Sequence, residues 1–539
     1  MSQFDRFVEE YLEFLWKSSP VRATYAGIHT YDHELDNVDR DFLEEINKKH
    51  KEYLRKLEKT EKKGLTDDEY VDWQLLKNSL ESEIKSFEEI RFWEKQPFVY
   101  AEICIDSLFL LFLREFAPIE VRTAAILSRM RQIPQLLKDG QQNLKDSPEI
   151  FTTLTLEIVN GGKKFCKTVV AALGSAVPKL RTELEKTGAQ ALAAFNDYDT
   201  FLREEYLPKS RGEFAIGRDL FNFKLMKNHM LPYNTEEIFE IGKEAKQSTE
   251  DDLKNIAQTI DTNKPWWEVV NDIKKRHPQA SELLATYQKE MESAKRFVLE
   301  KDLVSIPSGE ELVVIPTPQF HRPILPYAAY MRPAPFEKQQ KGFFYVTPIE
   351  ENVAKEEQEK ILRGHSFHKI PVTALHEGYP GHHLQLVRAN QHERKLRRLL
   401  RTTVFVEGWA LYCEEMMADA GFYSDPRTKL FKLKDQLWRA CRVIIDVGLH
   451  TKTMDYAQAV DFLVNDAKLE RVHAEKEVTR YTFTPTQPLS YMIGKKQILE
   501  LKKDYQTKLK DEFRLKEFHD KLISFGSIPI CLIRAALGI

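Results

Sequence analysis

The sequence has little of what several protein classes require. Its 539 residues include only five cysteines, which are scattered and form no CxxC pair, and this argues against a disulfide framework or a cysteine-rich zinc module. The longest apolar run, residues 108–113, is far shorter than the roughly 20 residues of a membrane-spanning helix. The N-terminal segment is acidic and amphipathic, without the pattern of a signal peptide. We therefore expect a cytoplasmic protein with no membrane partner.

Neither sign of charge dominates the chain. Its 80 basic and 83 acidic side chains leave a formal net charge of −3, which gives no reason to expect nucleic acid as a partner. The basic run ERKLRRLLR at residues 393–401 has no interleaved aromatic residues and no recognition motif, so we interpret it as a solvated helix face. Nothing in the sequence indicates the oligomeric state.

Glycine is also sparse, at 21 residues, and the apolar residues recur at helical spacing. Near the start, one helical face carries Phe4, Phe7, Val8, Tyr11, Leu12 and Leu15. Similar periodicity in residues 42–57, 70–87 and 121–144 predicts further helices. The predicted fold is mainly α, with an N-terminal helical lobe (residues 1–210) and a lobe that would hold the chemistry (211–539), joined as one compact unit.

The amino-acid composition changes between residues 305 and 348, a segment that is rich in proline, aromatic and β-branched residues. Residues 311–315 and 342–346 predict two short strands joined by an extended loop. This gives a small β element directly before the most reactive part of the chain. The alternative interpretation is a proline-rich surface loop.

A dense cluster of metal-binding residue types lies in the segment VTALHEGYPGHHLQ, which contains His376, Glu377, His382 and His383. Many zinc peptidases carry HExxH, whose two histidines lie one helical turn apart and whose glutamate is the general base. Here Pro380 occupies the position of the second histidine. On an unbroken helix the next histidines would lie about 9–10 Å further along the axis, too far to share one ion.

The Pro380-Gly381 pair offers a solution to this spacing. Proline removes a backbone donor and breaks the regular helix, and glycine permits unusual backbone angles. A turn at this point would bring a second histidine back towards His376, and both His382 and His383 remain candidates. The other interpretation is a helix end with ordinary polar contacts.

A second acidic residue supports the metal hypothesis. Glu407 interrupts the apolar helical stretch VFVEGWALYCEE and follows His382 by 25 residues. A carboxylate among apolar residues is costly to bury unless it is paired or binds a metal. Two histidines and one glutamate would leave an open position for water, as catalytic zinc requires. Glu414, two turns further on, would be an outer partner of the site or point to solvent.

The motifs HEGYPGHH and EGWALY together resemble the hallmark of the DUF family numbered 885. Other blocks fit this family in order along the chain: SPVRATYAGIHTYDHELDN, IGRDLFNFKL, PTPQFHRPILPYAAY, GFFYVTP, RVIIDVGLH and QPLSYMIGK. The family in turn resembles helical zinc peptidases of the oligopeptidase and angiotensin-converting-enzyme type. This resemblance implies a mostly helical fold with a deep central channel and a metal at its floor.

The resemblance also implies roles for the motif residues. His376 would be the first ligand of a single Zn²⁺ ion, and Glu377 would be the general base. His382 would be the second ligand, with His383 as its competitor, and Glu407 would be the third.

Residues 478–495, VTRYTFTPTQPLSYMIGK, offer groups that could act on a substrate. Amide hydrolysis needs a donor aimed at the oxygen that becomes negative, and we predict Tyr491 for this role. Arg480 would pair with a substrate carboxylate, and Tyr481 and His383 are further candidate substrate contacts. The alternatives are a packing tyrosine and a surface arginine.

The sequence thus predicts a zinc-dependent hydrolase, and more narrowly a metallopeptidase that acts on short peptides or peptide-like substrates. One alternative keeps the metal but replaces the peptide by another amide or an ester. The other is a catalytically silent scaffold that binds a partner. We interpret Asp446 and His450, one helical turn apart, as a structural pair.

Overall fold

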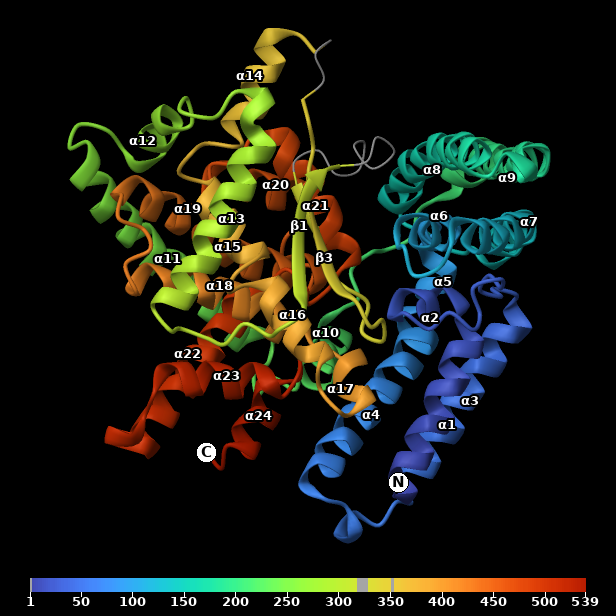
Figure 1. Ribbon diagram of the computed structural model, residues 1–539, viewed down its shortest axis with the longest axis horizontal. Helices are drawn as coiled ribbons and strands as arrows, with labels where there is room; N and C mark the ends of the chain where they lie inside the picture. The colour runs from blue at the N-terminus through green and yellow to red at the C-terminus, as the bar shows by residue number, and fades with distance from the viewer. Residues whose placement is uncertain (1, 318–327, 350–352) are drawn as a thin grey trace. The chain divides into compact units, whose positions relative to one another are not determined.

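The computed structural model describes residues 2–317, 328–349 and 353–539 and is mainly helical, with one small β-sheet (Figure 1). The described residues form two compact units. The first contains the chain up to Phe214 and the short segment Ala334–Lys338, and the second contains the remaining described residues from Ala215 onwards. The sequence placed its boundary between residues 210 and 211.

The first unit is an assembly of α-helices. Their bounds are α1 (Gln3–Ser18), α2 (Pro20–Ala26), α3 (Arg40–Glu58), α4 (Asp67–Lys85), α5 (Phe92–Lys95), α6 (Phe98–Leu113), α7 (Ile119–Asn143), α8 (Glu149–Ala176) and α9 (Arg181–Thr200). The helix α1 begins with a capping box between Ser2 and Asp5 and buries most of its predicted apolar face. The helices predicted at residues 42–57, 70–87 and 121–144 are confirmed by α3, α4 and α7.

The helix α6 is the most apolar of the first unit and packs against α7 and α8. In the described parts of the chain, no single helix is both long enough and apolar enough to cross a membrane. One bent pair, Asp67–Lys95 with Phe98–Leu113, meets that test only when its two members are taken together.

The second unit is also helical apart from its sheet. Its helices are α10 (Arg218–Asn228), α11 (Thr235–Ile260), α12 (Trp266–Ile273), α13 (Leu283–Glu300), α14 (Lys355–Arg363), α15 (Ile370–Glu377), α16 (His382–Asn390), α17 (Lys395–Leu399), α18 (Thr403–Asp419), α19 (Pro426–His450), α20 (Tyr456–Asn465), α21 (Arg471–Phe483), α22 (Ser490–Leu509), α23 (Leu515–Ser524) and α24 (Ile530–Ala536). The core is built around α19, which is buried without interruption from Ala440 to His450. Among its neighbours are α11, α12, α15, α18 and α22.

Two glycines bring α18 and α22 into direct backbone contact. A Cβ atom on Gly408 would lie 2.5 Å from the backbone of Gly494, and one on Gly494 would collide with the carbonyl oxygen of Val404. Since only hydrogen fits at both positions, no side chain separates the two helices at this point.

The sheet has the strand order β1-β3-β2, with β1 (Glu310–Pro316) parallel and β2 (Ala328–Met331) antiparallel to β3 (Gln340–Val346). The two predicted strands are confirmed by β1 and β3. The strand β2 was not predicted, because four half-buried residues are too few to show an alternating pattern. Residues 318–327 of the predicted connecting loop lie outside the described residues.

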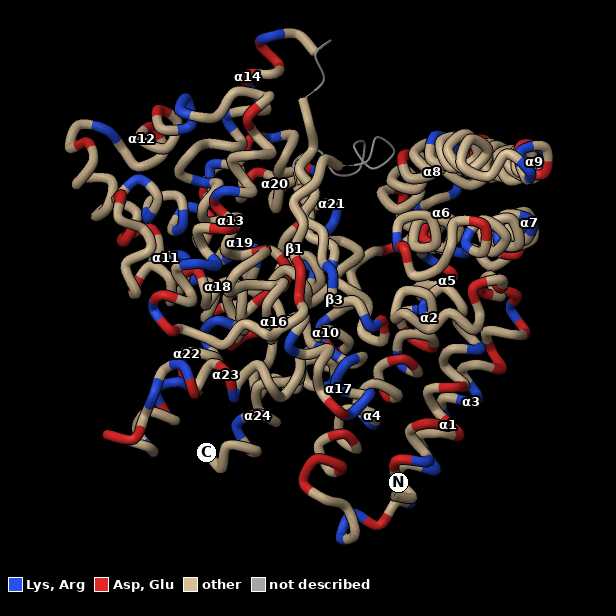
Figure 2. The backbone as a smooth tube through the Cα atoms, viewed as in Figure 1, with Lys and Arg blue, Asp and Glu red and all other residues tan. Residues whose placement is uncertain are grey.

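Charged residues of both signs are scattered among uncharged ones in each unit (Figure 2). The basic run at residues 393–401 was predicted to be a solvated helix face, and this was wrong for its central residue. The helix α17 covers only five residues, and Arg397 is 1% exposed, with its Nη1 atom donating to the Phe525 carbonyl oxygen at 3.4 Å. A buried guanidinium of this kind is held by backbone acceptors, which the local sequence does not reveal.

Candidate metal centre

The helix that carries His376 breaks at the predicted place. The helix α15 ends at Glu377 and α16 begins at His382, and the Tyr379–Pro380 peptide bond between them is cis. A Cβ atom on Gly381 would collide with the His376 carbonyl oxygen, so the chain can turn back this closely only at glycine. The turn brings the His376 and His382 rings to a centroid distance of 4.8 Å.

The helix α18 is attached directly to this turn. The Trp409 indole N–H donates to the Pro380 carbonyl oxygen at 2.9 Å, and the Cys413 thiol lies 3.6 Å from the same oxygen. Both side chains are fully buried. The register of α18 is thereby fixed against the turn, which places the Glu407 carboxylate 3.2 Å from His382 Nε2.

His376, His382 and Glu407 form a candidate metal centre. Each offers one ligand atom, and the three atoms lie within 4.8 Å of one another. Ligand atoms about 2.1 Å from a tetrahedral zinc ion are roughly 3.4 Å apart, so small side-chain movements would complete the geometry. Two imidazoles and one carboxylate are also a donor set that catalytic zinc uses. The residues present therefore fit a zinc ion.

His383 turns away from this centre, although it is next to His382. Its Nε2 atom lies 2.7 Å from Glu310 and its Nδ1 atom 3.0 Å from the Tyr330 hydroxyl, and the side chain is fully buried. Gly342 makes the room, because a Cβ atom there would lie 2.7 Å from His383 Nδ1. The geometry thus selects His382 over His383. With both ring nitrogens bonded inside the fold, His383 is no longer assigned to substrate.

Glu310 is a buried acid that the sequence analysis missed. Besides His383, it accepts hydrogen bonds from Lys295 Nζ at 2.6 Å and from the Tyr379 hydroxyl. Burial raises its pKa, but these donors outweigh burial and hold the pKa at about 2. This ionised carboxylate ties β1 to the turn between α15 and α16. An acid at the start of a half-buried strand was the available signal in the sequence.

Glu414 lies behind His376 and does not point to solvent. Its carboxylate is fully buried and accepts a hydrogen bond of 2.8 Å from His376 Nδ1. Because Nδ1 donates to this acid, Nε2 is the nitrogen left for a metal. Arg439 Nη2 lies 3.9 Å from the same Glu414 oxygen. Of the two alternatives for Glu414, the structure supports the outer partner.

The electrostatics keep Glu407 ionised. Burial raises the pKa of its carboxyl group, but His382, His376 and Arg442 lower it to about 2. Burial lowers the pKa of His382, and the nearby carboxylates of Glu407 and Glu377 raise it to above its usual value. The Glu407 carboxylate is therefore a negatively charged candidate metal ligand across the pH range in which proteins work.

Glu377 directly follows the first candidate ligand, at the end of α15. Its side chain is half-buried, and within the described part of the chain no hydrogen bond or ion pair engages its carboxylate. It acts electrostatically on His382. A carboxylate that lies beside the centre and is not held by other groups can accept a proton.

Tyr491 lies in the first turn of α22. Its ring is stacked on His376 at a centroid distance of 6.4 Å, and the Arg442 guanidinium lies 4.8 Å from the ring centre. Burial and the charge of Glu407 raise the pKa of its hydroxyl group, which stays protonated. Of the residues described, none forms a hydrogen bond with this hydroxyl, so it can donate to a ligand.

The other two predicted substrate contacts are engaged within the protein. The Tyr481 hydroxyl donates to Glu477 at 2.8 Å and accepts from Arg442 Nε at 2.8 Å, and the side chain is fully buried. Arg480 donates to Gln487 at 2.8 Å and to Glu477 at 3.0 Å. Neither assignment to substrate is retained, because these partners already use the polar groups.

Two buried residues hold the helices of the third ligand and of the tyrosine in place. Asp446 accepts the backbone N–H groups of Thr486 and Leu489 at 3.2 and 3.3 Å, and burial raises its pKa to about 8. His229 lies 2.8 Å from the Thr402 hydroxyl and 2.9 Å from that of Thr486. Since Thr402 caps α18 and Thr486 precedes α22, His229 connects the starts of both helices.

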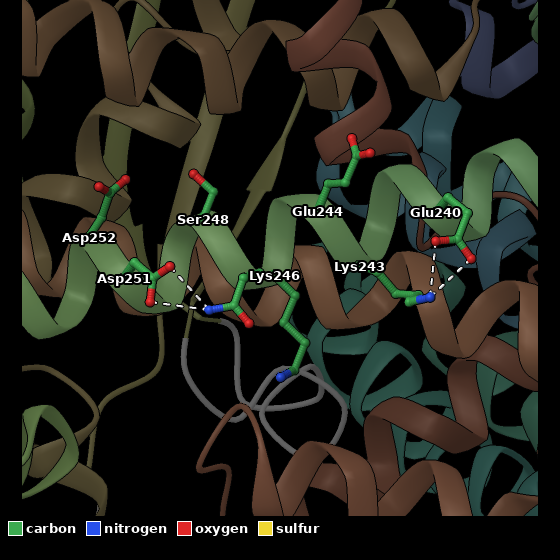
Figure 3. Close-up of a pocket in the computed structure, with 8 residues that line it drawn as sticks. Glu240, Lys243, Glu244, Lys246, Ser248, Asp251 and Asp252 are labelled. Atoms are coloured by element: carbon green, nitrogen blue, oxygen red, sulfur yellow. Dashed lines mark hydrogen bonds and ion pairs between the residues drawn. The ribbon is translucent and has the colours of Figure 1, made fainter.

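A hollow of about 790 Å³ lies along α11, and none of the candidate metal ligands lines it (Figure 3). It is lined by Glu240, Lys243, Glu244, Lys246, Gln247, Ser248, Asp251 and Asp252. Opposite charges neutralise each other within it, as in the two 3.0 Å contacts between Lys243 and Glu240. This is a charged helix face and not a second candidate site.

Fold and site together define a mainly helical protein with a two-histidine, one-glutamate centre built across a broken helix. The chain belongs to the family described as "Bacterial protein of unknown function (DUF885)", whose profile matches residues 20–537. The family resemblance expected from the motifs is thereby confirmed. Among curated proteins, none matches the sequence.

Two solved structures share this fold. One is described as a "putative lipoprotein of unknown function" from Shewanella oneidensis, with 24% identity, a TM-score of 0.83 and coverage of 100% of both chains. The other, a "putative lipoprotein" from Colwellia psychrerythraea, has 17% identity, a TM-score of 0.85 and coverage of 99% of this chain and 98% of its own. At these identities the likeness shows the fold alone.

The prediction of a cytoplasmic location was wrong. Both similar structures carry the description "putative lipoprotein", and lipoproteins are a class that is anchored to membranes. The prediction depended on the cysteine count, on the lack of long apolar runs and on an N-terminal segment without a signal-peptide pattern. The first two features do not report on a lipid anchor, since one modified residue leaves the composition of the folded chain unchanged.

Proposed function

We propose that this protein is a zinc-dependent hydrolase that cleaves short peptides or peptide-like amides. The observation that carries the proposal is the convergence of one ligand atom each from His376, His382 and Glu407 within 4.8 Å, with the Glu377 carboxylate near enough to act electrostatically on His382. The proposal that the protein binds a metal rests on this geometry. The proposal that its substrates are peptides rests on the resemblance of the family to helical zinc peptidases.

The ion would be held by His376 Nε2, a ring nitrogen of His382 and the Glu407 carboxylate. When bound, it would supply Lewis acidity towards a carbonyl oxygen and would lower the pKa of a water molecule. Glu414 keeps the His376 ring in the orientation and tautomer that this requires.

The remaining steps belong to side chains of the protein. Glu377 would accept the proton of the attacking water and deliver it to the leaving nitrogen, acting first as base and then as acid. The Tyr491 hydroxyl, whose pKa is raised, would donate a hydrogen bond to the oxygen that becomes negative. Arg442 lies over the Tyr491 ring and would limit its movement.

Metal analysis and turnover together test the proposal. Protein purified without chelator should contain one zinc per chain, and His376→Ala and Glu407→Ala should lose it. Glu377→Gln should keep the metal while its turnover falls by about 10²- to 10⁴-fold. The exposed Glu356 on α14 provides the matched control, since Glu356→Gln should change neither.

Digestion of an unbiased peptide library, read by mass spectrometry, identifies the reaction. Cleaved peptides with the wild type and none with Glu377→Gln would support a peptidase. Stoichiometric zinc without any peptide cleavage would favour another amide or ester as substrate. Absence of zinc from the wild type would refute the metal centre itself.

A further inference from the structure

Positive charge gathers beside the candidate metal centre. It comes from three neighbouring elements: the end of α12, the start of α15 and α19, against which the other two pack. A backbone hydrogen bond of 3.0 Å from Phe367 to Arg276 joins the first two. The members of this cation cluster are Lys274, Lys369, Lys434 and Arg439.

One buried carboxylate, Asp435, lies among these four cations. It contacts Lys434 at 3.3 Å and Arg439 at 3.8 Å, and it acts on the other two lysines electrostatically. The side-chain ammonium groups of those two, Lys274 and Lys369, make no hydrogen bond or ion pair with any described residue. The exposed Glu470 acts on Lys274 as well. Positive charge in the cluster therefore exceeds the negative charge that contacts it.

The cluster is also partly withdrawn from water. The side chains of Lys434 and Arg439 are only 13% and 12% exposed, and the Nε atom of Arg439 is buried with no hydrogen-bond partner. Burial and the neighbouring cations lower the pKa of Lys274 to about 8. Cations held together at low exposure repel one another, and an anion bound among them would relieve this cost.

Arg439 connects the cluster to the metal centre. Its Nη2 atom lies 3.9 Å from the Glu414 oxygen that binds His376, and its guanidinium carbon lies 5.7 Å from the centre of the Tyr491 ring. An extended peptide advances about 3.3 Å per residue. A substrate lying across the centre could therefore reach the cluster within a few residues of the bond that is cleaved.

We propose that the cation cluster binds a carboxylate of the substrate, and thus that the enzyme prefers peptides with a negative charge close to the cleaved bond. The inference deepens the proposed function and rests on it. A carboxylate is the anion that unmodified peptides carry, either at the C-terminus or on aspartate and glutamate side chains. Lys369 and Lys274 would supply charge, and the unpaired N–H of Arg439 a directed hydrogen bond.

Peptide binding to zinc-loaded Glu377→Gln protein, measured by calorimetry, tests this directly. Two pairs of peptides with a common backbone sequence are compared. The first pair differs only in its C-terminus, which is a free acid or an amide. The second pair is amidated and differs only in one residue near the end, which is glutamate or glutamine. At least one acidic peptide should bind about tenfold more tightly than its neutral partner. The pair that shows the difference identifies which carboxylate is bound. The difference should shrink as salt is added.

Added to that protein, Lys369→Met should abolish most of this difference and leave the neutral peptides unaffected, and Lys369→Arg should restore it. Lys360→Met, at a side chain 71% exposed on α14, should change nothing. Equal binding of acidic and neutral peptides would overturn the inference. An equal loss of affinity for all four in Lys369→Met would do the same, because it would indicate a structural role.

The wild-type enzyme separates this inference from the proposed function. Cleavage of the peptides without a charge preference in binding would refute the carboxylate site alone. A charge preference in binding that Lys369→Met removes, without any cleavage by the wild type, would refute the hydrolase and retain the site.

Discussion

Removal of the charge on Glu414 should weaken zinc binding without removing any ligand. The Glu414 carboxylate is fully buried and bonded to His376 Nδ1 at 2.8 Å. A hydrogen bond to a charged group at such a site contributes about 1.5–3 kcal/mol. Converted to affinity, this is about 10- to 150-fold, which covers the roughly 10- to 100-fold effect that losing the outer partner of a ligating histidine usually has. We expect the loss of zinc affinity in Glu414→Gln to lie near the lower limit of this range, because the amide oxygen can still accept the hydrogen bond from His376. The loss in Glu414→Ala should lie near the upper limit.

Competition with a chelator of known affinity measures the effect. Thermal unfolding with and without zinc provides a second readout, since a ligand that binds the folded state raises the melting temperature by an amount that grows with the logarithm of its affinity. The zinc-dependent rise should be smaller in both variants. Asp419→Asn, at an exposed acid at the end of the same helix, should behave as the wild type. An unchanged zinc affinity in Glu414→Ala would refute the role of Glu414, even if the variant were less stable.

Three further predictions concern stability. Gly381→Ala should lower the free energy of unfolding by about 3 kcal/mol or more, because its Cβ would collide with backbone. The control Gly161→Ala, at a helical glycine with open space around it, should be neutral or add about 0.5–1 kcal/mol. Equal effects of the two substitutions in chemical denaturation would contradict this prediction. His229→Leu should lower the free energy of unfolding by about 2 kcal/mol or more in the same assay, since it leaves two threonine hydroxyls without their shared partner. An unchanged free energy of unfolding would show that the contacts of His229 with these threonines contribute nothing to stability. Burial lowers the pKa of His229 and His365 to about 3 and that of His519 to about 4. Because the unfolded chain takes up these protons near pH 6.5, stability should fall by about 1.4 kcal/mol per pH unit for each histidine as the pH drops from 6.5 towards 4; a flat unfolding free energy over this range would refute the assignment.

Local patterns in the sequence predicted a large part of the structure. Helical periodicity located α1, α3, α4 and α7, and the helix break followed from the chemistry of Pro380 and Gly381, which act within a few residues of themselves. Glu407 could be singled out because an acid in an apolar helix needs a partner. In each case the cause lies within one or two helical turns of its effect.

Features that depend on distant residues could not be predicted in this way. The choice between His382 and His383 is decided by Glu310 and by the space at Gly342, which come from a different part of the chain. The buried state of Arg397 depends on a carbonyl oxygen 128 residues away. The cation cluster combines three helices, and nothing in any one of them indicates that their charges meet.

The contact between Gly408 and Gly494 has a consequence for how this protein could be altered. Side chains between two helices usually set their separation, so core substitutions shift it. Here the backbones themselves touch, and the spacing between the helix of Glu407 and the helix of Tyr491 is insensitive to the size of surrounding core residues. The cation cluster lies on other elements, α12, α15 and α19. Charge preference could therefore be redesigned there by exchanging lysines for neutral or acidic residues, while the distance between the third ligand and the tyrosine stays constant.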